Sequence, residues 1–105
     1  MDAPGTAARP QATHELKLWP EFYVLKKKGG KPFEVRRDDR EPRFEEGDTL
    51  LQRVWDPATK TYTGEEVSER VTCVLRGFSG IEPGFCVMGT AAPMFGWDQT
   101  YKGKS

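Results

Sequence analysis

The stretch from residue 20 to residue 36 reads PEFYVLKKKGGKPFEVR and predicts a helix, a turn and a strand in succession. Pro20 suits the first turn of a helix, and Glu21 complements the positive end of the helix dipole. Three lysines at positions 26–28 then meet the negative end, and Gly29-Gly30 allows the left-handed cap that stops a helix. We therefore expect one helix that begins at Pro20 and ends before the glycine pair.

The residues after the glycine pair alternate between apolar and charged side chains. Phe33 and Val35 are apolar, whereas Glu34 and Arg36 between them are charged. Because successive side chains of a strand point to opposite faces, this pattern predicts a strand with one apolar and one charged face. The expectation is that Phe33 and Val35 face the core and that the charged pair lies on the opposite face.

Alternation also predicts four further strands on either side of this stretch. They run from His14 to Leu18, from Thr49 to Trp55, from about Glu65 to Arg76 and from Phe85 to Met88. In the long strand Val67, Val71, Cys73 and Leu75 are expected on one face, and Trp55 is expected in the core. Five short strands leave exposed edges unless the sheet curls, so we predict a mainly β (α+β) fold with one or two helices, a small barrel of about five strands.

Length and composition bound the organisation of the chain. With 105 residues and 11.9 kDa there is room for one domain. We expect a disordered tail over 1–12, the domain over 13–88 and a flexible tail over 89–105. No apolar run approaches the roughly 18 residues that span a bilayer, and the first residues lack the basic and apolar blocks of a signal peptide, so a cytoplasmic protein without a membrane partner is expected. A monomer is expected as well.

The charge is balanced overall but unevenly distributed. Sixteen basic and sixteen acidic residues give a formal net charge of zero, which argues against general electrostatic attachment to DNA. Residues 1–40 carry nine basic and six acidic residues, whereas residues 41–69 carry three basic and eight acidic ones. An anion-binding surface is therefore expected within the first forty residues.

The metal-binding residue types are few. Two cysteines, Cys73 and Cys86, with a single histidine, His14, cannot supply a three- or four-ligand zinc site from Cys and His alone. Each cysteine lies in an apolar, strand-like run. Buried reduced thiols are the expectation, and neither a metal nor a cofactor is predicted.

The segment with the strongest chemical signal is Gly29 to Arg36. A glycine turn there delivers Lys31 to the start of a strand that carries Glu34 and Arg36. Such a group suits a ligand with donors and acceptors, because the carboxylate accepts from N–H groups while Lys and Arg meet carbonyl or phosphate oxygens. The alternative is that Glu34 and Arg36 simply pair in solvent.

The spacing Gly29-x-Lys31-x-x-Glu34-x-Arg36 resembles the signature of the ASCH domain, a PUA-like β-barrel. Blocks in the same order resemble an ASCH-like subfamily of uncharacterised bacterial and phage proteins over residues 13–88. These blocks are His14-x-Leu16-Lys17-x-Trp19-Pro20, Asp38-Asp39-Arg40, Gly47-Asp48-x-Leu50, Trp55-Asp56-Pro57, Tyr62-Thr63-Gly64 and Val71-Thr72-x-Val74-Leu75.

This resemblance implies a cleft between barrel and helix, lined by Lys31, Glu34 and Arg36, that binds RNA, a nucleotide or a modified nucleoside. It also implies an enzymatic alternative. One ASCH-related branch removes the acetyl group of N4-acetylcytidine with a Lys, a Thr and a Glu. Lys31 matches that lysine, and Glu34 stands at the position of the threonine. Another branch is described as a ribonuclease, so Lys31 and Glu34 are the candidate catalytic residues if the chain is an enzyme.

Four further residues are candidate ligand contacts. Lys17 and Trp19 share a strand face, where the indole is predicted either to stack on a base or to pack in the core, and the lysine to meet a phosphate. His14 is a candidate hydrogen-bonding residue or a structural one. Arg40 belongs either to the cleft or to a local ion pair. A protein-interaction module remains a third functional alternative.

Overall fold

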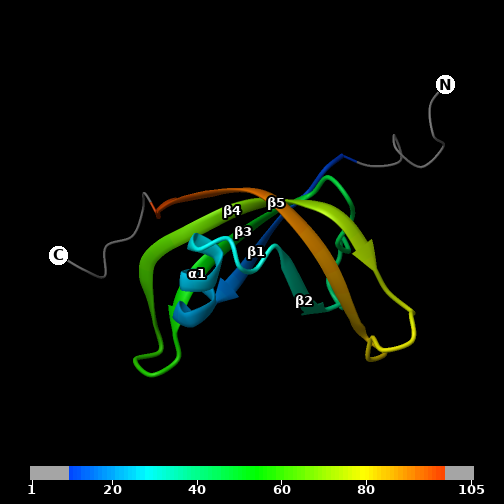
Figure 1. Ribbon diagram of the computed structural model, residues 1–105, viewed down its shortest axis with the longest axis horizontal. Coiled ribbons are helices and arrows are strands. Elements are labelled where there is room, and N and C mark those ends of the chain that lie inside the picture. The colour runs from blue at the N-terminus through cyan, green and yellow to red at the C-terminus, as the bar shows by residue number, and fades with distance from the viewer. Residues whose placement is uncertain (1–9, 99–105) are drawn as a thin grey trace.

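The computed structural model describes residues 10–98, which form a five-stranded sheet and one helix (Figure 1). The elements in chain order are β1 (Thr13–Leu18), α1 (Pro20–Lys27), β2 (Phe33–Arg37), β3 (Thr49–Asp56), β4 (Thr61–Leu75) and β5 (Phe85–Trp97). The strand order β1-β3-β4-β5-β2 leaves β1 and β2 at the two edges of the sheet. The mainly β class with an early helix is confirmed.

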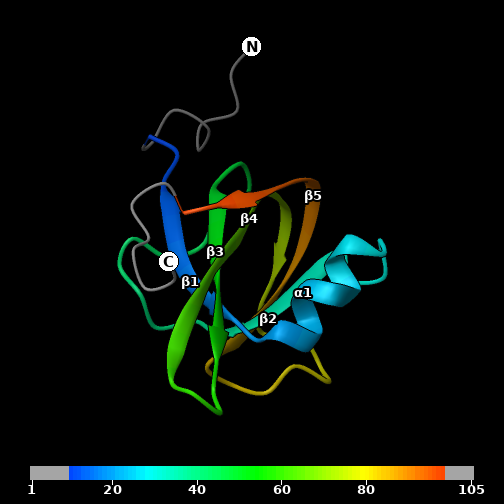
Figure 2. The ribbon, with the colours of Figure 1, turned by 90° about the vertical axis from the view of Figure 1, so that its left-hand side faces the viewer.

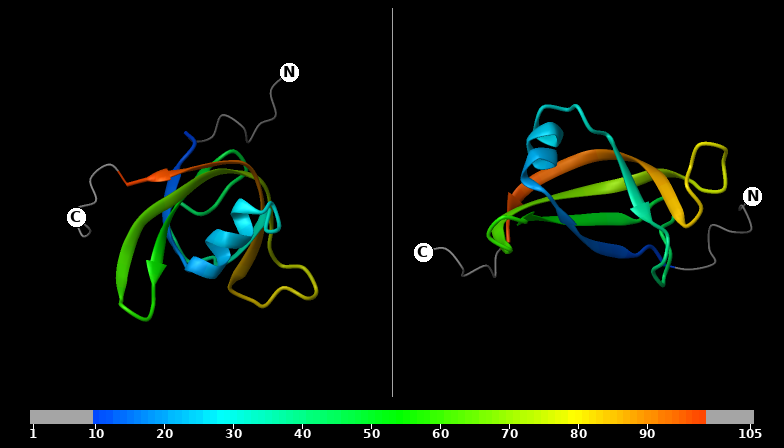
Figure 3. Two further views of the ribbon diagram at one scale, coloured as in Figure 1. Left: turned by 60° about the vertical axis from the view of Figure 1, so that its left-hand side comes forward. Right: turned by 90° about the horizontal axis from the view of Figure 1, so that it is seen from below.

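The sheet curls, and α1 lies on its concave side. Figure 1 shows β4 and β5 arching over α1 and β2, and Figures 2 and 3 show α1 at the open side of the curl. β1 pairs with β3 in parallel, whereas the other three strand pairs are antiparallel. The two edge strands are bridged by a side chain, since Arg36 Nη2 on β2 donates to the Lys17 carbonyl on β1 at 3.0 Å.

The helix begins and ends as the sequence predicts. Pro20 is its first residue, and Glu21 lies in the first turn. At the other end Gly29 has φ of +77°, and the amides of Gly29 and Gly30 donate to the carbonyls of Lys26 and Leu25. A glycine reaches this left-handed conformation without the strain that a Cβ would cause, so the pair closes the helix.

The faces of β2 are the reverse of the prediction. Glu34 is 2% exposed and points into the curl, whereas Phe33 and Val35 are 44% and 53% exposed. The prediction was wrong because alternation groups side chains by face without saying which face lies inside. Here α1 brings Lys26 to the interior, and that ammonium group satisfies the buried carboxylate.

β4 and β5 are longer and less regular than predicted. Register shifts in their pairing fall between Ser68 and Arg70 and between Val71 and Cys73, and they break the simple alternation of β4. Cys73 is consequently exposed rather than buried, while Cys86 is buried, and neither forms a disulfide.

The predicted tails are partly ordered. β5 continues to Trp97, which pairs with Glu65, so residues 89–97 belong to the sheet rather than to a tail. At the start, the Ala12 amide donates to Asp48 Oδ1 at 3.0 Å, which anchors this residue to the domain. The remaining predicted tail residues, 1–9 and 99–105, lie outside the described part of the chain.

Two apolar clusters form the core. The first is Leu16, Phe44, Leu50, Val71, Cys86 and Met88, and the second is Leu18, Tyr23, Val54 and Val67. Trp55 belongs to neither, contrary to prediction, because its side of β3 faces outward, where the ring meets Tyr62 and Lys17. Within residues 10–98 no helix is long and apolar enough to cross a membrane.

Candidate functional site

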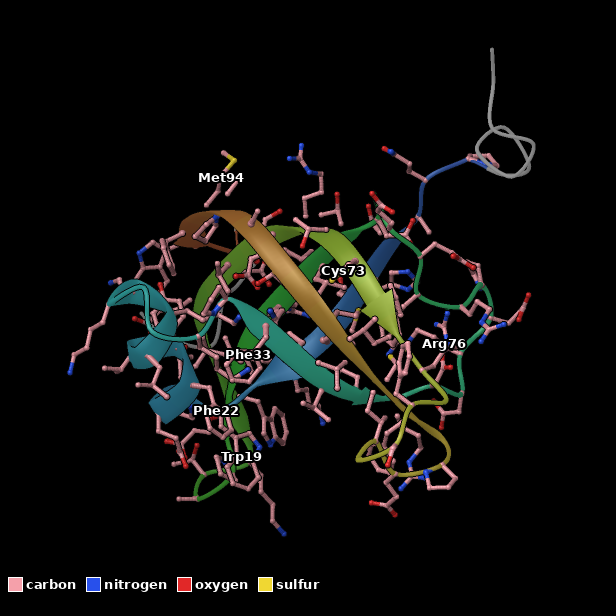
Figure 4. All side chains as sticks on the ribbon, turned by 45° about the vertical axis from the view of Figure 1, so that its right-hand side comes forward. Trp19, Phe22, Phe33, Cys73, Arg76 and Met94 are labelled. Carbon is pink, nitrogen blue, oxygen red and sulfur yellow. The ribbon has the colours of Figure 1, made fainter. Side chains whose placement is uncertain are left out.

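A pocket opens where the end of β1, the helix and β2 meet. Its volume is about 520 Å³ and its apolar walls include three aromatic side chains, Trp19, Phe22 and Phe33. Figure 4 shows these three rings on one side of the molecule, around α1 and the start of β2. The other lining residues are Lys17, Leu18, Leu25, Gly30, Lys31, Glu34, Val35 and Arg36.

Glu34 is the buried carboxylate of this pocket. Its Oε2 accepts from Lys26 Nζ and from Lys31 Nζ, both at 2.9 Å. Its Oε1 accepts from Arg36 Nε at 3.1 Å. A single carboxylate thus holds three cations, and it places Lys31 and Arg36 at the pocket wall.

Behind the pocket, Lys26 extends the ionic network into the centre of the curl. Lys26 Nζ also donates to Glu69 Oε1 at 2.9 Å and to the Lys31 carbonyl at 3.1 Å. Glu69 in turn accepts from Gln52 Nε2 at 2.8 Å and from Thr90 Oγ1 at 3.3 Å. Each of these side chains is almost fully buried, and every buried side-chain polar atom among the described residues has a partner.

Arg36 joins this network to the edge strands. Besides its bond to Glu34, its Nη2 donates to Gln52 Oε1 at 2.9 Å and to the Lys17 carbonyl at 3.0 Å. A guanidinium group has five N–H donors. Among the described residues none accepts a hydrogen bond from Nη1, so its two N–H groups are available to a ligand there.

Positive charges and N–H donors outnumber the carboxylates of the pocket and of the network behind it. Lys26, Lys31 and Arg36 oppose the two carboxylates of Glu34 and Glu69, which leaves one positive charge in excess. Lys31 uses two of its three N–H groups, on Glu34 and on the Phe33 carbonyl. The exposed polar groups of the pocket are thus donors, and a fitting ligand presents oxygen acceptors between aromatic walls.

Among residues 10–98 there is no group of three or more His, Cys, Asp and Glu side chains arranged to hold an ion. The buried carboxylate of the pocket is already occupied by cationic side chains.

The environment of Glu34 shifts its acidity. Burial by itself would raise the pKa, but the hydrogen bonds from Lys26 and Lys31 and the charges of Lys26 and Arg36 outweigh burial, so the pKa is lowered. The group therefore contributes stability that is present above the pKa of the unfolded chain, about 4.3, and is lost as the pH falls through the folded-state pKa.

A pH titration tests this assignment directly. We expect the Glu34 side-chain carboxyl carbon, followed by NMR, to titrate below about pH 4.3, the ordinary value for a glutamate. A midpoint for Glu34 at or above the ordinary value of about 4.3 would contradict the network described above.

The structure brings most of the predicted site residues together, but not all. Lys17, Trp19, Lys31, Glu34 and Arg36 line the pocket, and the indole of Trp19 is exposed rather than part of the core.

Two of the residues predicted to contact a ligand do not line this pocket. His14 is buried, and its Nε2 lies 2.8 Å from Asp48 Oδ2. Its ring packs on Phe44 with 4.6 Å between the ring centres. These contacts agree with the structural role that was the alternative for His14. Arg40 is not at the pocket; its guanidinium lies over the Phe44 ring at 5.1 Å.

Sequence reasoning missed the interior half of the network, Lys26, Gln52 and Glu69. A signal for them exists in the pattern, because each is a polar residue at a position where the periodicity of its element calls for an apolar one. Lys26 follows buried Tyr23 by one helical turn, Gln52 lies between Leu50 and Val54, and Glu69 lies between Val67 and Val71.

Comparison with known proteins places the chain in a family. The model of a domain of unknown function, DUF3850, matches residues 13–90, which is most of the chain. The chain belongs to the DUF3850 family. The match covers β1, α1 and β2, and therefore every residue that lines the pocket.

The DUF3850 domain also has a relative in a bacterial virus. Over 61 residues it is 38% identical to an uncharacterized 12.9 kDa protein in the GpA 3′ region of Escherichia phage P2. The alignment covers 58% of this chain and 52% of the phage protein, so the chain spans about half the length of that relative. Neither description states an activity.

Proposed function

We propose that this DUF3850 domain binds RNA, or a nucleotide or modified nucleoside, in the pocket between α1 and β2. The observation that carries the proposal is the pairing of aromatic walls with a cluster of cationic donors. Trp19, Phe22 and Phe33 offer planes for a base, while Lys31 and Arg36 offer N–H groups to its carbonyl oxygens.

The size and chemistry of the pocket agree with such a ligand. A volume of about 520 Å³ lies within the roughly 300–1,000 Å³ typical of small-molecule sites. Stacking on aromatic side chains is the usual way for proteins to hold an unpaired base. The ASCH-like motif adds support, because Lys31, Glu34 and Arg36 of that motif all line this one pocket.

The geometry favours binding over the hydrolase alternative. Of the residues between 10 and 98, those that line the pocket include no hydroxyl or thiol side chain to act as a nucleophile. Glu34 is held by three cations and its pKa is lowered, which makes it a weak base. Positioning of an acceptor-rich ligand is the task that Lys31 and Arg36 are arranged to perform.

The experiment is calorimetric titration of the protein with the common ribonucleosides, their 5′-monophosphates, N4-acetylcytidine and short RNAs. We expect binding by wild type and about tenfold weaker binding by Phe33→Ala, because stacking contributes about 1–3 kcal/mol per base. Phe33 is chosen because its ring is an exposed wall that makes none of the hydrogen bonds of the network, although Lys31 Nζ lies 5.1 Å from the centre of the ring.

Phe78→Ala is the matched control. Phe78 is equally an exposed phenylalanine, but it lies in the loop between β4 and β5 and does not line the pocket. If no compound binds, or if both variants weaken binding alike, the proposal fails. Release of acetate or cleaved RNA during the titration, abolished in Lys31→Ala, would instead establish the hydrolase alternative.

A further inference from the structure

A second, polar hollow adjoins the pocket along β1. Its volume is about 350 Å³ and it shares Lys17 and Arg36 with the aromatic pocket. Four basic side chains and one acidic side chain line it: Lys17, Arg36, Arg40, Arg53 and Glu15, together with Leu16 and Tyr62. The two hollows therefore form one continuous surface, apolar at the helix and cationic toward β3.

The cations of this hollow differ in how far they are already neutralised. Arg36 is engaged by Glu34, and Arg53 pairs with Asp98, lies 3.9 Å from Glu15 and stacks over the Tyr62 ring. These two arginines are held in place by carboxylates on the protein.

Lys17 and Arg40 are held by aromatic rings instead. Lys17 Nζ lies 3.8 Å from the centre of the Trp55 ring, and the Arg40 guanidinium lies 5.1 Å from that of Phe44. Within residues 10–98 neither has a carboxylate at ion-pair distance. A ring face orients a cation without neutralising it, so both retain their charge and their N–H donors for an anion.

We infer that this hollow is the phosphate subsite of the pocket, so that the ligand is a nucleoside phosphate rather than a free nucleoside. The inference rests on the proposed function, because it supposes that the base lies between Trp19, Phe22 and Phe33. Lys17 and Arg40 then meet the phosphate oxygens, and Arg36, which lines both hollows, spans the junction of sugar and phosphate.

A base with a phosphate beside it is present both in a free mononucleotide and in each nucleotide of an RNA strand. Both present a phosphate beside a base, and both use the same cations. Because the formal net charge of the chain is zero, the electrostatic attraction for a phosphate is local to this hollow rather than spread over the protein surface. A short oligonucleotide that binds more tightly than its mononucleotide identifies the strand as the source, and equal affinity identifies the mononucleotide.

The test compares each ribonucleoside with its 5′-monophosphate on the full chain by calorimetry. We expect the phosphate to tighten binding by about tenfold, as charge-assisted hydrogen bonds do, and we expect the gain to shrink as salt is raised. In Arg40→Gln, at a residue that lines only the polar hollow, most of that gain is lost while the affinity for the nucleoside is unchanged. In Lys17→Gln most of the gain is lost as well. Arg70→Gln, which removes an exposed arginine that lines neither hollow, retains the gain.

The two proposals fail in different ways. If nucleosides bind but the phosphate adds nothing, or if Arg40→Gln and Lys17→Gln keep the full gain, the phosphate subsite is wrong and nucleoside binding stands. If neither nucleosides nor nucleotides bind, the proposed function itself is wrong. Inorganic phosphate is titrated in parallel, and binding as tight as that of a nucleotide would show an anion site independent of the base.

Discussion

Replacing Glu34 by glutamine will lower the free energy of unfolding by about 3–5 kcal/mol, the usual cost of removing one partner from a buried ion pair. The substitution keeps the size of the side chain but removes its charge. Lys26, Lys31 and Arg36 then converge on a neutral amide, and Lys26 in the interior keeps Glu69 as its carboxylate partner. Repulsion among the cations adds to the cost of the lost attraction.

Urea unfolding at pH 7, followed by circular dichroism, measures the effect. Glu46→Gln is the matched control, because Glu46 is an exposed glutamate near the start of β3, and its replacement should change the unfolding free energy by less than about 0.5 kcal/mol. A loss of less than about 1 kcal/mol for Glu34→Gln would mean that the network does not stabilise the fold in the way its geometry implies.

Phe44→Ala will destabilise the domain by a similar amount, about 3–5 kcal/mol, because it removes a fully buried aromatic ring and leaves a cavity. The ring packs in the cluster of Leu16, Leu50 and Val71 and against the imidazole of His14. Its backbone carbonyl is held as well, since it accepts from Arg76 Nη2 at 3.0 Å.

The same urea experiment measures this loss, with Phe78→Ala as its control. Phe78 is 59% exposed, so its truncation should leave the unfolding free energy nearly unchanged. Equal effects of the two substitutions would show that the segment between β2 and β3 does not close the core as described. Because Arg40 stacks on Phe44, loss of the ring should also weaken the preference for nucleotides over nucleosides.

The role of Phe44 marks one limit of prediction from sequence. It lies in a segment between β2 and β3 that has neither helical nor strand periodicity, and nothing in that segment indicates a buried ring. Its burial depends on where the segment crosses the end of the curled sheet. The helix end, by contrast, depends on Gly29 and Gly30 themselves, and the structure confirms it.

The element boundaries that local residue patterns set were predicted well, and those that pairing with a distant strand sets were not. β1, β2 and β3 begin and end within a residue or two of the predicted positions, because alternation and turn residues are local signals. β5 runs to Trp97, well beyond the predicted end, because its second half is held by pairing with β4 rather than by its own pattern. Pairing between distant segments leaves little trace in either segment alone.

The chain by itself determined the class of fold, the helix with its glycine stop, and the grouping of Lys31, Glu34 and Arg36 near one another. Tertiary structure decided which face of β2 lies inside and which residues complete the site. Because side chains alternate along a strand, the sequence places Glu34 and Arg36 on the same face of β2. Burial of charged side chains requires partners, and Lys26 and Gln52 supply them from other elements. Those partners make the charged face the inner one and leave Phe33 at the pocket wall.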